Sequence, residues 1–230
     1  MICNAHIDPS WQWDWPEGAS ATLSTFYSAA KLCDEFDYIF CHNEVTVYKY
    51  VEEYAPELFA KIQELVKAGK GHIMGGWYLQ PDCNMPSGES FVRQIREGQR
   101  YFEEKFGVRP TTAINFDPFG HTVGLVQIVK KCGQDSLIIC RPHTDEIDIE
   151  ENIFIWKGFD GSEIKVYRSP DGYNSPLGTM KITYEEAEKH IMNVIKERIG
   201  TDSRVTVVHD NFSNLRKILD NFSNRLSHNI

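Results

Sequence analysis

The sequence predicts an α/β fold built on a parallel sheet, which is either open or closed into a barrel. Short apolar runs alternate along the chain with longer segments of helical periodicity. Parallel strands require such crossover connections, so this alternation favours a parallel sheet over an antiparallel one. A length of 230 residues also suits a single domain with a sizeable core.

The strands are expected at the short apolar runs, which lie at Ile2–Ala5, Asp37–Cys41, Gly71–Trp77, Thr111–Phe116, Ser136–Cys140, Ile153–Trp156, Ile164–Tyr167 and Val205–Val208. The helices are expected between them, at Ala19–Glu35, Pro56–Ala68, Gly88–Phe106, Val123–Lys131, Tyr184–Arg198 and Leu215–Leu226. Two of these helices have clear boundary signals. Pro56 suits a first helical turn and Gly69 follows the last one. Ser87 with Ser90 can cap the next helix, and Gly107 ends it.

The composition restricts the partners and the compartment. With 24 Lys and Arg against 33 Asp and Glu, the formal charge is 24 − 33 = −9, which argues against nucleic acid or an anionic membrane as a partner. No apolar stretch approaches the length of a spanning helix, and the first residues lack the features of a signal peptide. The six cysteines are scattered without a C-x-x-C pair, as reduced thiols would be. We therefore expect a cytoplasmic protein.

Polar and titratable residues directly follow several predicted strands. They are His6 and Asp8, then 42–44, then Asp82, then Asp117 and His121, and finally Arg141 and His143. Parallel sheets place their chemistry at the carboxyl ends of their strands. We therefore expect these side chains to surround one site.

His6 and Asp8 are one residue apart, so in an extended chain their side chains point to the same side. An imidazole and a carboxylate placed in this way can bind a divalent metal, with zinc as the first choice. The alternative is a histidine that is hydrogen-bonded to a loop aspartate. Asp117 closes a predicted strand and precedes a Pro-Phe-Gly turn. Its carboxylate can act as metal ligand and nucleophile, or it can simply cap the following helix.

Other residues of the same region suit a sugar ligand. Trp11, Trp13 and Trp15 lie just beyond Asp8, and aromatic rings stack on the C–H faces of sugars, although core packing is the alternative for the last two. Arg141 can hold a carboxylate or donate to a sugar hydroxyl, and a rim salt bridge is its alternative. His121 fits a pocket residue better than a metal ligand. The sequence has no serine elbow, Walker loop or G-x-G-x-x-G motif.

Taken together, these segments resemble family-38 glycoside hydrolases, the retaining α-mannosidases. The resemblance rests on AHIDPSWQWDWPEG at 5–18, GGWYLQPDCNMPSGESFVRQ at 75–94, GQRYFEEKFGVRP at 98–110, NFDPFGH at 115–121, RPH at 141–143 and, more weakly, FIWKGFDGSEI at 154–164. It implies a (β/α)7-type barrel with parallel strands, here incomplete at the carboxyl end. Residues 1–200 would form the amino-terminal barrel domain, and residues 201–230 a weakly matching terminal segment.

The resemblance also implies a site and a mechanism. His6, Asp8 and Asp117 would bind one Zn²⁺ ion, and Asp117 would also be the catalytic nucleophile. The substrate-binding residues would be Trp11, Asp82, His121 and Arg141. The expected reaction is hydrolysis of terminal α-mannosyl residues of glycans through a covalent mannosyl-enzyme, with retention of configuration.

The sequence departs from the family pattern after about residue 200. We find no convincing match there for the family's further histidine ligand or for its acid/base carboxylate, and His209 is only a weak candidate. Two alternatives therefore stay open: a metal-dependent polysaccharide deacetylase, and a catalytically incomplete fragment that binds sugar or metal. Edges left open by missing barrel strands would favour a homo-oligomer.

Overall fold

The computed structural model describes residues 2–143 and 145–169, together with 183, 185–186, 188–190 and 193. The chain forms two sheets in this part. The first sheet has the order β1-β2-β3, and all its strands are parallel. Its members are β1 (Ile2–Asn4), β2 (Ile39–Glu44) and β3 (Gly71–Trp77).

The second sheet has the order β4-β5-β7-β6. Its members are β4 (Thr112–Asn115), β5 (Ser136–Ile139), β6 (Ile153–Lys157) and β7 (Glu163–Arg168). β4, β5 and β7 are parallel, whereas β6 runs antiparallel to β7. The described residues thus show a mixed α/β fold with parallel strands, and not a complete (β/α)7 barrel.

The two predicted strands between 153 and 168 are confirmed, but the prediction that all strands are parallel is wrong for β6. The connection between β6 and β7 consists of residues 158–162 alone, and a parallel crossover needs a dozen residues or more. The two strands therefore form a hairpin. Gly161 in this connection has a φ of 82°, a turn conformation that glycine adopts readily.

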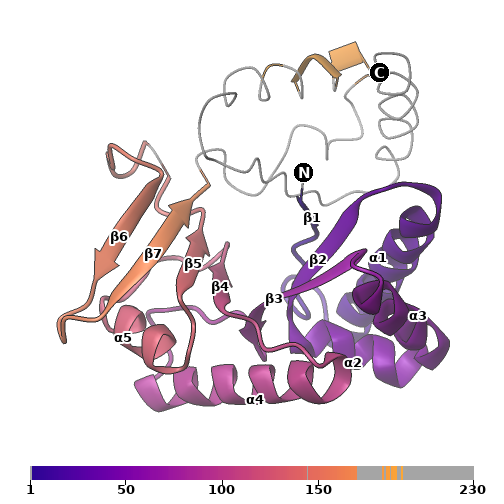
Figure 1. Cartoon of the computed structure of the whole chain (residues 1–230), viewed down its shortest axis with the longest axis horizontal. Helices are drawn as coiled ribbons and strands as arrows, with labels where there is room; N and C mark the ends of the chain where they lie inside the picture. The colour runs from indigo at the N-terminus through magenta and orange to yellow at the C-terminus, as the bar shows by residue number, and fades with distance from the viewer. Residues whose placement is uncertain are drawn as a thin grey trace.

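Of the five helices described in full, three contact strands of the first sheet, one contacts the second sheet, and one packs mainly against other helices (Figure 1). In chain order they are α1 (Trp15–Glu35), α2 (Val45–Tyr54), α3 (Pro56–Lys67), α4 (Gly88–Phe106) and α5 (Gly124–Lys131). α4 packs on β3 and also contacts α5, so it runs beneath both sheets in the view of Figure 1. This helix therefore connects the two halves of the described structure.

The predicted boundary signals are confirmed. Pro56 begins α3, and Gly69 lies just beyond its end with a φ of 76°. The Ser87 side chain accepts a hydrogen bond from the Ser90 backbone N–H at 3.3 Å, and Gly107 ends α4 in the left-handed conformation. These residues satisfy backbone groups that a helix end leaves unpaired.

Helix α2 was not predicted, because its sequence VTVYKYVEEY is rich in β-branched and aromatic residues, which favour strands. Val45, Val47, Tyr48 and Val51 are buried in the structure. Tertiary packing of this apolar face therefore outweighs the intrinsic preference of the segment.

The core is divided between the two halves. One cluster fills the space between α1, α2, α3 and the first sheet, and a second lies between α4, α5 and the second sheet. A third, smaller cluster contains residues of both sheets, namely Cys41, Met74, Ile114, Phe116 and Cys140. This third cluster holds the two sheets side by side with their strand ends together.

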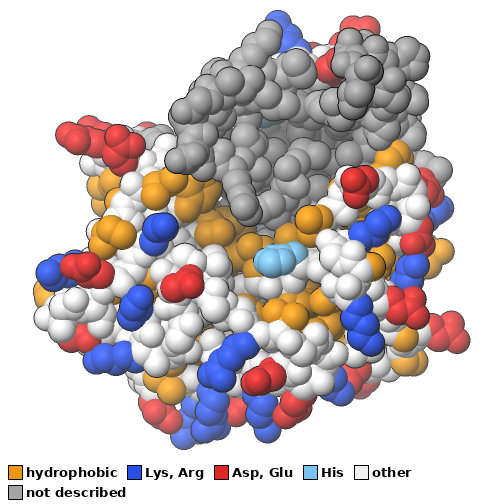
Figure 2. Space-filling model, in the orientation of Figure 1, with side chains coloured by type: hydrophobic (Ala, Val, Ile, Leu, Met, Phe, Trp, Pro, Cys, Tyr) orange, Lys and Arg blue, Asp and Glu red, His pale blue; other side chains and the backbone are white. Residues whose placement is uncertain are grey.

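The cysteines whose side chains are described, Cys33, Cys41, Cys83, Cys132 and Cys140, are free thiols. The outer face of α4 has interspersed acidic and basic side chains (Figure 2), including the pairs Arg93–Glu89 and Arg100–Glu97. No described helix combines the length and the apolar character needed to cross a membrane.

The predicted strand Val205–Val208 and the predicted helix Leu215–Leu226 lie outside the described residues. Within the predicted helix Tyr184–Arg198, the structure describes residues 185–186, 188–190 and 193, and all of them are helical.

Candidate active site

A cavity of about 790 Å³ opens at the carboxyl ends of the parallel strands. Its walls come from the segments that follow β1, β3, β4 and β5 and from the end of β2. The predicted site residues that line it are His6, Asp8, Trp11, Asp82, Asp117 and Arg141. Residues that are far apart in the sequence thus meet at the edge where parallel sheets place their chemistry.

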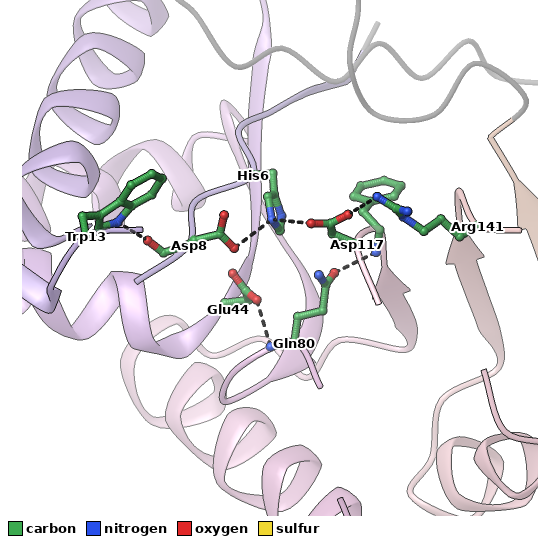
Figure 3. A network of polar contacts seen from close by, with 8 residues as sticks. His6, Asp8, Trp13, Glu44, Gln80, Asp117 and Arg141 are labelled. Carbon is green, nitrogen blue, oxygen red and sulfur yellow. Dashed lines mark hydrogen bonds and ion pairs between the residues drawn. The ribbon is translucent and has the colours of Figure 1, made fainter. Parts of the chain in front are cut away.

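Asp117 lies between a histidine and an arginine (Figure 3). Arg141 donates from Nη2 to Oδ1 of Asp117 at 2.7 Å, and His6 Nε2 lies 3.8 Å from Oδ2. His6 Nε2 also lies 3.2 Å from Asp8 Oδ1. Asp117 follows β4, and the turn Pro118–Gly120 directs the chain away after it. The carboxylate is therefore oriented by charged groups and still faces the cavity, with 23% of its side chain exposed.

The carboxylates around His6 determine its charge. Burial alone would lower the pKa of His6, but its hydrogen bond with Asp8 and the negative charges of Glu44, Asp8 and Asp117 raise the pKa above its usual value. The site thus favours positive charge at the point where the three side chains meet.

Glu44 is a site residue for which sequence reasoning found no role. It ends β2 and is buried, with 3% of its surface exposed. Burial raises its pKa to about 6, although the charge of His6 acts in the opposite direction. Its position after the second predicted strand was the one indication in the sequence that Glu44 belongs to the site. Only the folded structure shows that Glu44 lines the cavity.

Gln80 was also missed. It follows β3, lines the cavity, and donates from its backbone N–H to Glu44 Oε1 at 2.8 Å. Its side-chain Oε1 accepts a hydrogen bond from the backbone N–H of Phe116, also at 2.8 Å. The available indication was its position shortly after the third predicted strand, but the sequence analysis singled out Asp82 there and not this uncharged amide.

The aromatic residues lie at the rim. Trp11 has 67% of its surface exposed and packs edge-on against Trp13, with ring centroids 5.3 Å apart. Trp13 donates from Nε1 to the carbonyl O of Asp8 at 3.2 Å, which ties this rim to a predicted metal ligand. Trp15 begins α1 and is 53% exposed, so it is not part of the core.

Gly18 allows α1 to pack against the segment that carries Asp8. A Cβ atom at Gly18 would lie only 2.2 Å from the carbonyl O of Pro9, so a side chain there would push this segment away. Asp82 also lines the cavity and accepts a hydrogen bond from the Asn84 backbone N–H at 3.2 Å, which forms a local turn.

His121 lies in a neighbouring cavity of about 600 Å³ and not in the cavity of Asp117. Phe119 and Arg141 line both cavities. His121 Nε2 lies 3.1 Å from the carbonyl O of Arg141, and burial lowers the pKa of this histidine. Its geometry links it to the backbone of Arg141.

The chemistry of the predicted zinc ligands suits zinc in part. One imidazole nitrogen and two carboxylates are ligands that zinc accepts, and ligand atoms of a tetrahedral zinc site lie about 3.3 Å apart. The separations of 3.2 Å between His6 and Asp8 and 3.8 Å between His6 and Asp117 are close to that value. Within the described residues, however, no group of three or more His, Cys, Asp or Glu side chains has the full arrangement of a metal site.

The sequence matches the amino-terminal domain of the glycosyl hydrolases of family 38 over residues 1–221. The chain belongs to this family. Among its relatives, alpha-mannosidase G of Dictyostelium discoideum is 31% identical over 79% of this chain, and the alpha-mannosidase of Saccharomyces cerevisiae is 30% identical over 74%. The matched regions are 17% and 16% of the length of those relatives, so this family-38 chain spans less than a fifth of either.

Solved structures agree with the fold of a family-38 domain. An alpha-mannosidase from Enterococcus faecalis superposes with a TM-score of 0.77 at 18% identity, and covers 98% of this chain and 27% of its own. A 4-alpha-glucanotransferase from Thermococcus litoralis has a TM-score of 0.71 at 16% identity, with 95% and 36% covered. A protein from Mycobacterium smegmatis described as a polysaccharide deacetylase has a TM-score of 0.60 at 13% identity, with 96% and 83% covered. At these identities the similarity shows the fold alone.

Proposed function

We propose that this domain is the catalytic amino-terminal domain of a zinc-dependent, retaining α-mannosidase that hydrolyses terminal α-mannosyl residues of glycans. The observation that carries the proposal is the Asp117 carboxylate, which faces the cavity while Arg141 and His6 flank it. The names of the curated relatives support the substrate class, because they are alpha-mannosidases.

In the proposed first step, an oxygen of Asp117 attacks the anomeric carbon of the mannosyl residue as the bond to the leaving-group oxygen breaks. A covalent mannosyl-enzyme forms, and water then attacks the same carbon and releases mannose with retained configuration. The hydrogen bond from Arg141 holds Oδ1, so the carboxylate keeps one orientation. Trp11 at the rim offers an aromatic face to the sugar ring.

His6, Asp8 and Asp117 are the residues that would hold zinc, and bound zinc would orient the sugar through its hydroxyl groups. The negative charge around His6 favours a cation at this place. We assign no residue of this chain to the family's further histidine ligand or to its acid/base carboxylate, and His209, the candidate for the former, lies outside the described residues.

An Asp117→Asn variant tests the assignment of the nucleophile. Activity towards an aryl α-mannoside should fall by at least about a thousandfold, because the amide cannot form the covalent intermediate. Asp34→Asn is the matched control, since Asp34 is an exposed carboxylate paired with Lys61 on another surface. Loss of activity in both variants, or in neither, would refute the assignment.

Both variants are assayed in the 230-residue chain and in a form extended at its carboxyl end. A direct measurement of Zn²⁺ or Co²⁺ binding accompanies the assays, because it reports on His6 and Asp8 even in an inactive form. Removal of metal by a chelator should abolish activity, and added Zn²⁺ should restore it.

The free thiols of the described residues support a reducing compartment, and we propose the cytoplasm. Association into a homo-oligomer stays a prediction, which sedimentation analysis of the purified chain would check.

A further inference from the structure

Gln80 connects the carboxyl ends of three strands, of which β2 and β3 belong to the first sheet and β4 belongs to the second (Figure 3). Its backbone N–H donates to Glu44, which ends β2, and its side chain accepts from Phe116, which follows β4. Gln80 itself lies three residues beyond β3. Since Phe116 directly precedes Asp117, this second hydrogen bond acts on the peptide unit next to the proposed nucleophile.

The chemistry of the contact determines how the Gln80 amide is turned. A backbone N–H can only donate, so the atom that faces Phe116 must be the amide oxygen. The amide NH₂ group must then point the other way. Among the described residues Nε2 has no hydrogen-bond partner, and it is not one of the buried polar atoms left without a partner. Because Gln80 lines the cavity, its NH₂ group is available to a ligand there.

We propose that Gln80 is a substrate-binding and positioning residue of this site. Its Oε1 holds the peptide N–H before Asp117, and its Nε2 donates a hydrogen bond to one hydroxyl of the bound mannosyl residue. A sugar hydroxyl is a good acceptor for such a group, and the donor is already oriented before the substrate arrives. The inference rests on the proposed function of the site and names a contact within it.

The test combines one variant of the protein with a series of substrates. Gln80→Met keeps the length of the side chain but removes both the acceptor and the donor. Wild type and variant are each assayed with an aryl α-mannoside and with its 2-, 3-, 4- and 6-deoxy analogues. One of the deoxy analogues lacks the hydroxyl that Gln80 binds. With that analogue, kcat/KM relative to the parent mannoside should fall about fivefold further in wild type than in Gln80→Met. The remaining analogues should lose activity equally in both proteins.

Gln94→Met is the matched control. The Gln94 side chain also accepts a hydrogen bond from a backbone N–H of the same loop, that of Leu79 at 2.8 Å, but Gln94 does not line the cavity. This variant should show equal losses with every deoxy analogue. A purely structural role for Gln80 would give the same result in both variants.

Equal losses for all four analogues in Gln80→Met would overturn the inference, while wild-type cleavage that depends on Asp117 would still support the proposed function. All these proteins are assayed in the form extended at its carboxyl end, and if wild type in that form does not cleave the mannoside, both proposals fail together. Should Gln80→Met not fold, Gln80→Glu replaces it, because a carboxylate keeps the acceptor for Phe116 and removes the donor; the negative charge that it adds is common to all analogues and cancels in the comparison. The same unequal loss is then expected, and equal losses would again overturn the inference.

Discussion

Replacing Gly98 by alanine should destabilise the fold, although alanine is the better helix former. Gly98 lies in α4 where this helix crosses β3. A Cβ atom there would lie 2.2 Å from the carbonyl O of Gly76 and 2.6 Å from the carbonyl C of Trp77. Both are backbone atoms, so neither can rotate out of the way. Since ordinary contact begins at 3.4 Å, the helix must retreat by about 3.4 − 2.2 = 1.2 Å.

Two opposing effects determine the size of the change. A glycine-to-alanine exchange in an unobstructed helix gains about 1 kcal/mol of stability. Overpacking that forces the backbone to move costs about 1–3 kcal/mol and sometimes more. The retreat of α4 also loosens Phe91, Ile95 and Phe102, which are almost completely buried. We therefore expect Gly98→Ala to lower the free energy of unfolding by about 1–2 kcal/mol, towards the upper end of the difference between the two effects.

Urea unfolding followed by circular dichroism measures this difference, and Gly88→Ala is the control on the same helix. A Cβ atom at Gly88 would meet only the Ile128 side chain, at 3.8 Å, so this variant should be as stable as wild type or more so. A Gly98→Ala protein as stable as Gly88→Ala would refute the reasoning. A fall in activity should accompany the loss of stability, because Gln94 of α4 holds the backbone N–H groups of Tyr78 and Leu79.

Two further predictions concern charged and titratable groups. Arg141→Met removes the hydrogen bond to Asp117 at 2.7 Å, a charge-assisted bond worth about 1.5–3 kcal/mol, so kcat/KM should fall about ten- to a hundredfold, as steady-state assays would show. Burial and the charge of His6 lower the pKa of His42 to about 3, so this histidine stays neutral in the folded protein. In the unfolded chain His42 keeps the usual histidine pKa and binds a proton when the pH falls below that value. Stability should therefore fall between pH 7 and 5.5, by about 1 kcal/mol more in wild type than in His42→Asn, as urea unfolding at both values would show.

Much of the fold could be predicted, because the first three parallel strands and most helices have strong local signals. Pro56, Ser87 and Gly107 mark helix ends through their own backbone or side-chain chemistry, which does not depend on the rest of the chain. α2 could not be predicted in this way. Its Val and Tyr side chains favour a helix only because neighbouring helices bury them.

The antiparallel pairing of β6 and β7 was available in the sequence. The segment Gly158–Ser162 between these strands contains turn residues and is too short for a helix, so it predicts a hairpin. The prediction of parallel strands extended a rule that holds for the earlier elements to a place where the connection length excludes it.

The candidate site could be predicted in outline and not in detail. His6, Asp8, Asp117 and Arg141 stand at strand ends, and the topology of a parallel sheet brings such positions together. The same rule applies to Gln80, which lies three residues beyond β3, but the rule does not show which groups its side chain and backbone reach. Its position is defined by hydrogen bonds to β2 and to the segment after β4, and these bonds exist only once the two sheets have docked.

The geometry of the site depends on how the two sheets are joined. His6 and Asp8 follow a strand of the first sheet, whereas Asp117 follows a strand of the second, and no described strand of one sheet pairs with a strand of the other. Other contacts must therefore align them. Gln134, which precedes β5, donates from its side chain to the carbonyl O of Gly75 in β3 at 2.7 Å, and Gln80 supplies a second such link at the mouth of the cavity. These two hydrogen bonds act together with the apolar cluster of Cys41, Met74, Ile114, Phe116 and Cys140, so the distance between His6 and Asp117 depends on how the two sheets dock.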